Sequence, residues 1–370
     1  MSEQYTIFAI NPGSTSTKVA LFRNEEQIFK RTVSHNDQVI ASFARVWDQY
    51  AYRKEQILGF LQEESVELGE LSCVVGRGGL FRPTISGTYA INKAMLSDAR
   101  ACFQGEHASN LGCVLAYGIA WDLGIPSYIV DPPCVDEMED VARLSGHSAI
   151  QRRSLHHALN IKAVARRTAD ELGKDLAGLN LVIAHIGGGI SVVPLRHGRM
   201  IDTNNALSGG PFSAERTGSL PMMDFVEYMF DKELSKNEAD KMIVGNGGMI
   251  SYLGTKSIAE AAEKAEAGDV EARLVLRAMA YQIAKEISGM SAALKGKVDG
   301  IVLTGGGANC SFLTDEITGY INYLSPVYLY PGEDEMSALA LGALRVLQGK
   351  EEPLSYPLEI APAAAEQDET

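Results

Sequence analysis

The chain carries the same local plan twice, about half its length apart. The segments IFAINPGSTSTKVALFRNEEQI and VIAHIGGGISVVPLRHGRMI each contain an apolar strand, a polar residue, a glycine turn, a second apolar strand, an arginine and a third strand. The polar residues are Asn11 and His185, and the arginines are Arg23 and Arg196. Two unrelated hairpins can also look alike. A duplicated domain with a phosphate-binding hairpin in each half is the more specific interpretation.

The composition is that of an ordinary globular chain, with 46% hydrophobic and 22% charged residues among 370. This length favours two domains. The formal net charge of −14 argues against a nucleic-acid partner, because affinity for the phosphate backbone comes from clustered cations. We expect no membrane span and no signal peptide, since no apolar run reaches about 18 residues and no basic region precedes the first strand. The five cysteines form no Cys-x-x-Cys pair, which favours a cytoplasmic location over a disulfide scaffold or zinc ribbon.

Apolar periodicity and turn residues predict the order of the elements. Strands are expected at 5–11, 17–23, 27–34, 73–76, 127–130, 181–186, 190–195, 200–203, 300–304 and 327–330. Helices are expected at 38–67, 111–123, 154–172, 257–267, 270–294 and 335–347, with Ser154 as a helix N-cap and Gly173 as a stop. An apolar stripe within 274–294 fits a dimer interface and a core face equally well.

Three glycine turns follow apolar strands and indicate a bound nucleotide. In NPGSTSTK, the glycine lets backbone N–H groups turn toward an anion, and hydroxyls and a lysine add donors. The residues expected to contact the nucleotide are Asn11, Ser14, Ser16, Lys18, Gly187, Gly188, Gly189, Gly305, Gly306 and Gly307. No G-x-x-x-x-G-K-S/T run exists and no G-x-G-x-x-G follows a strand, which disfavours a P-loop enzyme and a dinucleotide dehydrogenase.

Five polar residues stand at strand ends or in glycine-rich loops, and each has an ordinary reading and a functional one. Arg77 and Arg216 suit bidentate binding of carboxylate or phosphoryl oxygens, although a lone arginine is usually a solvated surface group. His185 can be a satisfied core histidine, and Glu335 a charge at a helix N-terminus. Asp131 and Glu335 are natural handles for Mg²⁺. Their joint placement with three glycine turns favours function.

These motifs, in this order, resemble the acetate-kinase family from residue 5 to about residue 348. INPGSTSTK resembles the family's first phosphate signature, and AHIGGGIS its second. TGGGAN resembles the adenine-side turn, and GEDEMSALA the C-terminal metal carboxylate. VVGRGG and GGPFSAERTGSLP differ from the acetate-type loops and resemble the butyrate branch. The resemblance implies an α/β, duplicated actin-like ATPase fold of two βββαβαβα-type domains with a cleft between them.

The resemblance also implies domain boundaries and residue roles. Residues 1–153 and 336–350 would form the first domain, 154–335 the second, and 351–370 a polar tail. Asn11, Ser14, Ser16 and Lys18 would approach the ATP phosphates and the phosphoryl acceptor. The other implied roles are catalytic for Arg77, His107, His185 and Arg216, and Mg²⁺-binding for Asp131 and Glu335.

The implied activity is reversible transfer of a phosphoryl group from ATP to butyrate, giving butyryl phosphate and ADP with Mg²⁺ as cofactor. A kinase for isobutyrate, propionate or acetate stays open, because one methylene changes binding by only about 1–3 kcal/mol. Ile186, Pro211, Phe212 and Val75 are the residues we expect around the acyl chain. A sugar kinase is disfavoured, since no catalytic aspartate stands in a suitable context. A non-metabolic actin-like or chaperone ATPase is the alternative from another class. The family resemblance also implies a homo-oligomer.

Overall fold

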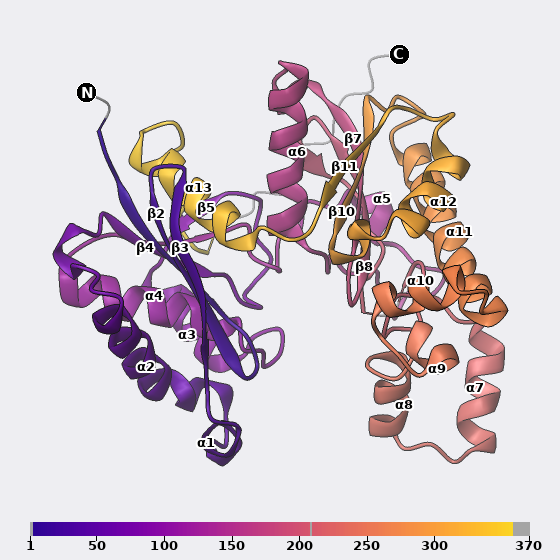
Figure 1. The fold of residues 1–370 in the computed structure, drawn as a ribbon, viewed down its shortest axis with the longest axis horizontal. Coiled ribbons are helices and arrows are strands. Elements are labelled where there is room, and N and C mark those ends of the chain that lie inside the picture. Colours follow the sequence, from indigo (N-terminus) through magenta and orange to yellow (C-terminus); the bar gives the residue numbers. More distant parts are fainter. Residues whose placement is uncertain (1–2, 208, 358–370) are drawn as a thin grey trace. The chain divides into compact units, whose positions relative to one another are not determined.

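The computed structural model describes residues 3–207 and 209–357, and the chain divides into two compact units (Figure 1). Unit 1 comprises Met1–Cys134 and Met336–Thr370, and unit 2 comprises Val135–Glu335. The sequence prediction put the first boundary after residue 153, whereas the units divide after Cys134. The return to unit 1 falls at Met336, where the sequence placed it.

Unit 1 is built on a six-stranded sheet in the order β3–β2–β1–β4–β6–β5. Its first three strands are antiparallel neighbours, and the fourth and sixth run parallel to the first. Short turns force the antiparallel pairing, whereas the parallel strands are reached through helical crossovers. The strands are β1 (Thr6–Pro12), β2 (Ser16–Arg23), β3 (Glu26–Ser34), β4 (Cys73–Arg77), β5 (Thr88–Ala90) and β6 (Ser127–Val130).

Helices cover both faces of this sheet (Figure 1). One face packs on α2 (Tyr50–Glu63), α3 (Lys93–Ala101) and α4 (Asn110–Leu123) in a single apolar core. On the other side, α13 (Glu335–Leu347) brings Gly342 against β6, where a Cβ at that position would lie 2.5 Å from a methyl of Val130. The start and end of α13 were predicted correctly.

The helix predicted over 38–67 is in fact broken. The structure has α1 (Asp37–Ser42), extended backbone at Phe43, a 3₁₀ turn at Val46–Gln49, and then α2. Asn36 caps α1 by accepting hydrogen bonds from the backbone of Gln38 and Val39.

The predicted polar tail is partly built into unit 1. Leu354 exchanges backbone hydrogen bonds with β5, and the Tyr356 side chain is 3% exposed. The Tyr356 hydroxyl donates to Asp98 at 2.7 Å and accepts from the backbone N–H of Arg82 at 2.9 Å. The rest of the predicted tail, residues 358–370, lies outside the described residues.

Unit 2 repeats the topology of unit 1 with a sheet in the order β11–β10–β7–β8–β9. Its first three strands are antiparallel, and the last two are parallel to β7 and β10. The internal repeat of the sequence therefore corresponds to a repeated βββ meander followed by parallel strands. The strands are β7 (Asn180–Ile186), β8 (Ile190–Arg196), β9 (Arg199–Met200), β10 (Gly300–Gly305) and β11 (Val327–Pro331).

Alternation along β7 and β10 supplies two cores, one on each face of the unit 2 sheet. Val182 and Ala184 face a core with α10, α11 and α12, while Leu181 and Ile183 face a core with α6. The helices are α5 (Asp140–Arg143), α6 (Ala158–Leu172), α7 (Met222–Asp231), α8 (Lys236–Ile243), α9 (Met249–Leu253), α10 (Ile258–Glu266), α11 (Val270–Ala293) and α12 (Ser311–Ile321).

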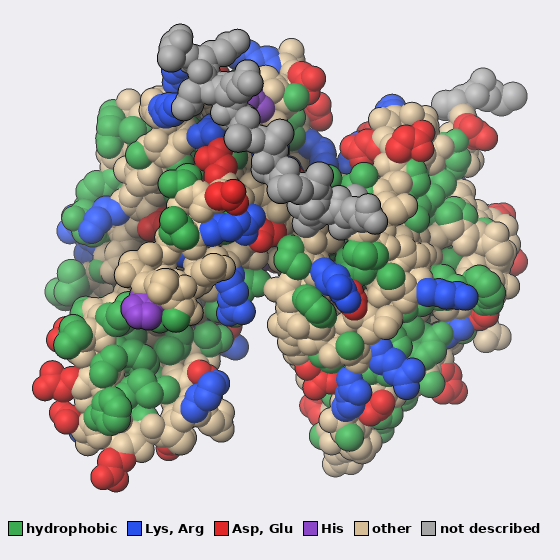
Figure 2. Space-filling view, turned by 180° about the vertical axis from the view of Figure 1, so that it is seen from behind, with side chains coloured by type: hydrophobic (Ala, Val, Ile, Leu, Met, Phe, Trp, Pro, Cys, Tyr) green, Lys and Arg blue, Asp and Glu red, His purple; other side chains and the backbone are tan. Residues whose placement is uncertain are grey.

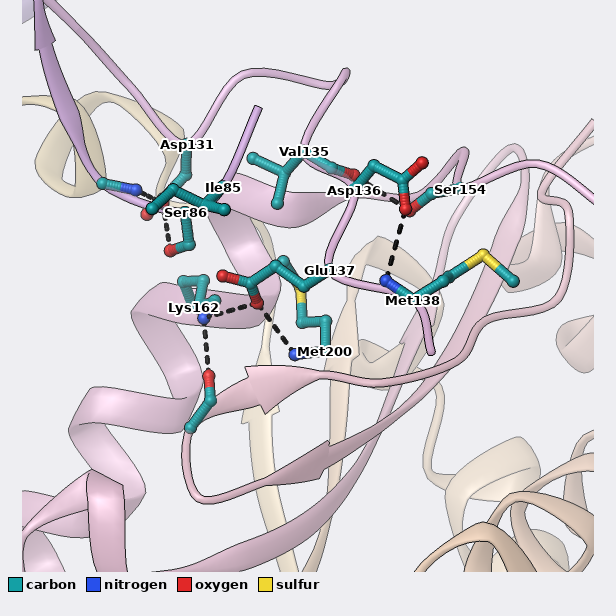
Figure 3. Close-up of polar contacts among 12 residues, drawn as sticks. Ile85, Ser86, Asp131, Val135, Asp136, Glu137, Met138, Ser154, Lys162 and Met200 are labelled. Atoms are coloured by element: carbon teal, nitrogen blue, oxygen red, sulfur yellow. Dashed lines mark hydrogen bonds and ion pairs between the residues drawn. The ribbon is translucent and has the colours of Figure 1, made fainter. Parts of the chain in front are cut away.

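Two predictions in unit 2 were wrong in detail. The helix predicted from residue 154 starts at Ala158, and the Ser154 hydroxyl is no cap, since it donates to the backbone oxygen of Val135 at 2.9 Å (Figure 3). The strand predicted at 200–203 is shorter and ends at Met200. Gly173 does end α6, in the left-handed conformation with φ of 61°.

The apolar stripe of the long helix α11 is core. Its members Leu276, Met279, Ile283, Ile287 and Met290 are all buried in one cluster. The dimer-interface reading of this stripe is therefore wrong, and the core reading is confirmed.

A buried ion pair fixes the chain where unit 2 begins. The Glu137 carboxylate accepts hydrogen bonds from the Lys162 ammonium at 3.2 Å and the Met200 backbone N–H at 2.9 Å (Figure 3). Both charged side chains are 6% exposed. Removing one partner of such a pair costs about 3–5 kcal/mol, because the other charge is left buried and unpaired.

Apolar side chains lie on the surface of unit 2 along α7. None of the ten residues of this helix, all of them described, is buried, and Met222, Met223 and Phe230 are at least 76% exposed. Hydrophobic side chains gather over this region in Figure 2. Among the described residues, no helix is both long enough and apolar enough to span a bilayer.

Candidate active site

Three parallel strands of unit 2 end at one edge of its sheet and bring two predicted glycine turns together. β7 pairs with β10, and β10 with β11, so their carboxyl ends are neighbours. Gly305 has φ of +87°, and a Cβ there would lie 2.5 Å from the oxygen of Ile186. Only glycine fits this position, because both the backbone conformation and the close approach exclude a side chain. Ligands of open α/β sheets bind outside such strand ends.

His185 stands at this edge and is 1% exposed. Its Nδ1 lies 2.8 Å from Oδ1 of Asn160 on α6. Its ring stacks on the His157 ring, with centroids 3.9 Å apart and an interplanar angle of 14°. Oε1 of Glu333 lies 3.0 Å from Nε2, but Nε2 makes no hydrogen bond to any described residue. Nε2 is thus the ring nitrogen on the side of the glycine turn, with the Glu333 carboxylate beside it.

Arg216 packs against the same glycine turn from another side. A Cβ at Gly189 would lie 2.0 Å from its Nη1, and Nη1 donates to the backbone oxygen of Ala206 at 2.8 Å. The buried Nε has no hydrogen-bond partner in the described part of the chain. Burial lowers the pKa of the guanidinium, and the carboxylate of Glu215 opposes that shift. The arginine stays a cation at neutral pH.

Hydrogen bonds hold the loop that carries Arg216 against the turn Gly187–Gly189. Ser213 donates from its hydroxyl to the oxygen of Gly188 at 2.6 Å, and its backbone N–H donates to the oxygen of Arg216 at 2.9 Å. The structure thus brings together, in unit 2, His185, Arg216 and the turns Gly187–Gly189 and Gly305–Gly307. Nε2 of His185 lies beside the Glu333 carboxylate, and Nε of Arg216 has no hydrogen-bond partner among the described residues. With a turn free of side chains, these two buried nitrogens form a site suited to a phosphoryl group.

The predicted phosphate hairpin of unit 1 is the turn between β1 and β2. Asn11 lies opposite Lys18 in the register, and the Gly13 backbone N–H donates to the oxygen of Ser16 at 2.8 Å. Lys18 and Ser14 are exposed, whereas Asn11 and Ser16 are half-buried. All four residues predicted here therefore belong to one hairpin.

Arg77 and His107 also belong to unit 1, and their charges interact. Arg77 ends β4, and a Cβ at Gly112 of α4 would lie 2.1 Å from its backbone oxygen. Nδ1 of His107 lies 2.8 Å from the Ser109 hydroxyl. Although much of His107 is exposed, partial burial and then the charge of Arg77 lower the pKa of its ring. The neutral ring is favoured near pH 7.

The two predicted metal carboxylates lie in different units. Asp131, fully buried in unit 1, has φ of 38° and accepts hydrogen bonds from the Ser86 hydroxyl at 2.5 Å and the Gly87 backbone N–H at 2.8 Å (Figure 3). Glu335 opens α13 at the end of unit 2. No group of three metal-binding side chains occurs within residues 3–207 and 209–357. Separate carboxylates still suit Mg²⁺, which binds largely through phosphate oxygens and water.

Three residues around His185 and one residue that binds the unit 1 hairpin were not predicted from the sequence. Asn160, His157 and Glu333 contact the His185 ring, and Arg53 contacts the hairpin carbonyls. Glu333 follows the end of a predicted strand, and this position could have identified it as a candidate. Asn160 and Arg53 sit inside helices, where nothing in the pattern separates them from ordinary helical residues.

The residues expected around an acyl chain are buried. Ile186 and Val75 have no exposed surface, and Phe212 is 8% exposed. Phe212 also lines a cavity of about 810 Å³ in unit 2, together with Thr217, Leu220 and Tyr252. Thr217 is the direct neighbour of Arg216, so one wall of this cavity adjoins the site.

Three solved structures of similar fold come from different organisms. An acetate kinase from Porphyromonas gingivalis matches with a TM-score of 0.75 and 18% identity, covering 93% of this chain and 100% of that one. A propionate kinase from Francisella tularensis matches with a TM-score of 0.70 and 18% identity, over 91% and 98%. An acetate kinase from Entamoeba histolytica matches with a TM-score of 0.73 and 14% identity, over 94% and 99%.

The fold and the repeated topology define a two-domain, actin-like ATPase-type α/β protein, as the sequence predicted. Residues 143–326 match the model of the acetokinase family. This match identifies that segment, which contains His185, Arg216 and both glycine turns of unit 2, as an acetokinase-family segment.

Proposed function

We propose that this chain is a short-chain carboxylate kinase, which moves the γ-phosphoryl group of ATP to a carboxylate and releases ADP. The observation that carries the proposal is that two buried side-chain nitrogens, His185 Nε2 and Arg216 Nε, make no hydrogen bond to a described residue and belong to side chains that lie against the turn Gly187–Gly189. The acetokinase-family match over the segment that contains them supports the same activity.

The unit 2 residues have distinct roles in this proposal. Phosphoryl transfer needs alignment and charge neutralisation more than covalent help. His185, with a proton on both ring nitrogens, donates a hydrogen bond from Nε2 to an oxygen of the transferring group, while Nδ1 donates to Oδ1 of Asn160. Arg216 neutralises charge on the same group. The turn without side chains permits close approach of the phosphate to the backbone.

The bond changes need no general base and no phosphorylated enzyme. A carboxylate oxygen forms the new bond to phosphorus while the bond from phosphorus to the ADP oxygen breaks. The acceptor is already an anion and releases no proton. His185 therefore acts as a hydrogen-bonding group, with no nucleophilic step.

For unit 1 we propose phosphate contacts by Asn11, Ser14, Ser16 and Lys18. Arg77 and His107 are proposed to act on the acyl carboxylate and the phosphoryl group. The low pKa of His107 favours a neutral ring, which can accept or donate a hydrogen bond next to the Arg77 charge.

We propose Mg²⁺ as the cofactor, held directly or through water by Asp131 and Glu335. When bound, the ion neutralises charge on the phosphate oxygens. The hydrogen bonds from Ser86 and Gly87 fix the orientation of the Asp131 carboxylate.

Butyrate is the proposed acceptor, with isobutyrate, propionate and acetate as weaker ones. An apolar wall that includes Phe212 fits a short alkyl chain better than acetate alone. A difference of one methylene changes the relative rate by about ten- to two-hundredfold at most, so overlapping use of these acids is expected. Assembly into a homo-oligomer stays a prediction.

A hydroxylamine-trapping assay with ATP, Mg²⁺ and single carboxylic acids tests the proposal. Acyl phosphate reacts with hydroxylamine to give a hydroxamate, which iron(III) turns into a coloured complex, so the assay detects acyl phosphate formation and not ATP hydrolysis. We expect hydroxamate from C2 to C5 acids with a maximum at butyrate. ATP hydrolysis without hydroxamate would instead indicate an actin-like or chaperone ATPase.

A further inference from the structure

The unit 1 hairpin rests on a fully buried arginine. Arg53, on α2, has no exposed surface. Its Nη1 donates to the backbone oxygens of Gly13 at 2.9 Å and Ser16 at 3.2 Å, and its Nη2 donates to that of Ser14 at 2.8 Å. One guanidinium thus holds three carbonyls of a single tight turn.

The remaining hydrogen bonds of Arg53 also go to neutral oxygens. Nη1 donates to the Thr17 hydroxyl at 3.2 Å, and Nε donates to Oε1 of Gln49 at 2.9 Å. No carboxylate forms an ion pair with Arg53 among the described residues. Burial lowers its pKa to about 10, which leaves the group charged at neutral pH. Buried charges are normally paired, so this one lacks its usual counter-ion.

The two faces of the hairpin are different. Ser16 and Lys18 alternate with Thr17 along β2, so their side chains point to the opposite face of the strand. Thr17 is buried and contacts Arg53 and His35, whereas Lys18 is exposed. Arg53 therefore binds the hairpin carbonyls on the buried face of the hairpin. The exposed face presents hydrogen-bond donors.

We propose that Arg53 is a positioning residue of an anion site on hairpin 11–18, where it fixes the turn and supplies the buried cation that a bound phosphoryl group neutralises. The proposal rests on the kinase function insofar as the anion is a phosphate of ATP. The geometry and the charge of the Arg53 side chain contribute separately to anion binding. Different substitutions of Arg53 distinguish the two contributions.

The test compares three variants of the full chain with the wild type. Arg53→Lys keeps the charge and loses the planar fork, while Arg53→Gln loses the charge. Lys54→Met is the matched control on the same helix, because Lys54 binds Gly118 and Asp122 instead of the hairpin. Titration calorimetry gives Kd for MgATP and for adenosine, and hydrogen exchange reports the amides of residues 13–17.

A cation within about a nanometre of an anion changes affinity by roughly ten- to a hundredfold at an effective dielectric constant near 20. We therefore expect Arg53→Gln to raise Kd for MgATP by that factor, and Arg53→Lys by less. Adenosine, which has no phosphate, should bind all four proteins alike. The hairpin amides should exchange faster in both Arg53 variants and unchanged in Lys54→Met.

Unchanged MgATP affinity in Arg53→Gln would overturn the proposal, and so would an equal loss for adenosine, which indicates a general structural defect. If Arg53→Gln does not fold, unchanged hydrogen exchange of the hairpin amides in Arg53→Lys would still overturn the proposal. A wild type that makes no acyl phosphate contradicts the kinase function alone, since the comparison of MgATP with adenosine decides the role of Arg53 separately.

Discussion

Nδ1 of His185 lies 2.8 Å from Oδ1 of Asn160, and both residues are buried. An amide oxygen only accepts, so Nδ1 carries a proton and Nε2 is the ring atom that faces the glycine turn. A Cβ at Gly187 would lie 3.1 Å from Nε2. One hydrogen bond from a helix thereby determines which ring nitrogen a ligand meets.

Asn160→Leu should lower turnover about ten- to a hundredfold, the usual cost of removing a group that orients a functional side chain. The near-isosteric leucine fills the space but accepts no hydrogen bond. Thr168→Val is the matched control, since Thr168 is buried on the same helix and its hydroxyl donates to the backbone oxygen of Val164 at 2.8 Å. Turnover measured by hydroxamate formation should be nearly normal in this control.

The double variant Asn160→Leu/His185→Ala extends this prediction. If Asn160 acts through His185, the double variant should be no slower than His185→Ala alone. Multiplicative losses in the double variant would show that Asn160 has an independent role.

Gly189→Ala should reduce turnover by about a hundredfold, because the new methyl would displace Arg216 and misplacement by about 1 Å costs that much. Gly289→Ala in α11 is the control, since the Cβ that it adds meets no atom within 4 Å outside its own helix. This control should stay within about threefold of the wild type. Steady-state kinetics compare the two variants, and equal losses would argue against the Arg216 contact as the cause.

Arg216→Ala should lower turnover by about a thousandfold, as expected when an arginine that stabilises phosphoryl-transfer charge is lost. MgATP affinity should change much less, and Arg216→Lys should recover only part of the rate. Arg277→Ala is the control, since Arg277 is exposed and forms an ion pair with Glu316 at 3.4 Å. A near-normal rate in Arg216→Ala would remove this residue from the site.

The fold was largely predictable because its signals are local. The repeat predicted two βββ meanders, and the strand ends predicted where the glycine turns meet. The predicted helix boundaries were wrong where tertiary contacts determine them. Ser154 forms a hydrogen bond with Val135 and caps no helix, and extended backbone at Phe43 separates two helices. Helix α7 was not predicted, although its apolar residues recur at helical spacing.

The residues of the candidate site could be predicted where they lie at strand ends and in turns, but not where they lie inside helices. His185, Arg216 and the glycine turns were predicted from position and occur together in unit 2. Asn160 and Arg53 act through helices whose contacts depend on the tertiary fold. Arg53 also breaks the expectation that a lone arginine is solvated, because the carbonyls that bind it come from residues 37–40 positions earlier.

His35 should make stability fall between about pH 6.5 and pH 4. Burial, with the nearby charge of Arg53, lowers the pKa of His35 to about 4. In that range the unfolded chain binds a proton that the folded chain does not, so folding loses up to about 3 kcal/mol as the pH falls. Thermal or urea unfolding measured across this range checks the slope. His35→Gln should flatten it, and an unchanged slope would assign the effect to other groups.

The central claim is phosphoryl transfer to a carboxylate oxygen, and oxygen labelling tests it in one measurement. Butyrate carrying ¹⁸O in both carboxyl oxygens is incubated with MgATP and the enzyme, and the product is observed by ³¹P NMR. We predict butyryl phosphate whose phosphorus resonance shows the isotope shift of a directly bonded ¹⁸O, because the carboxylate oxygen attacks phosphorus. Butyryl phosphate without that shift, or no acyl phosphate from any short acid, would contradict the account.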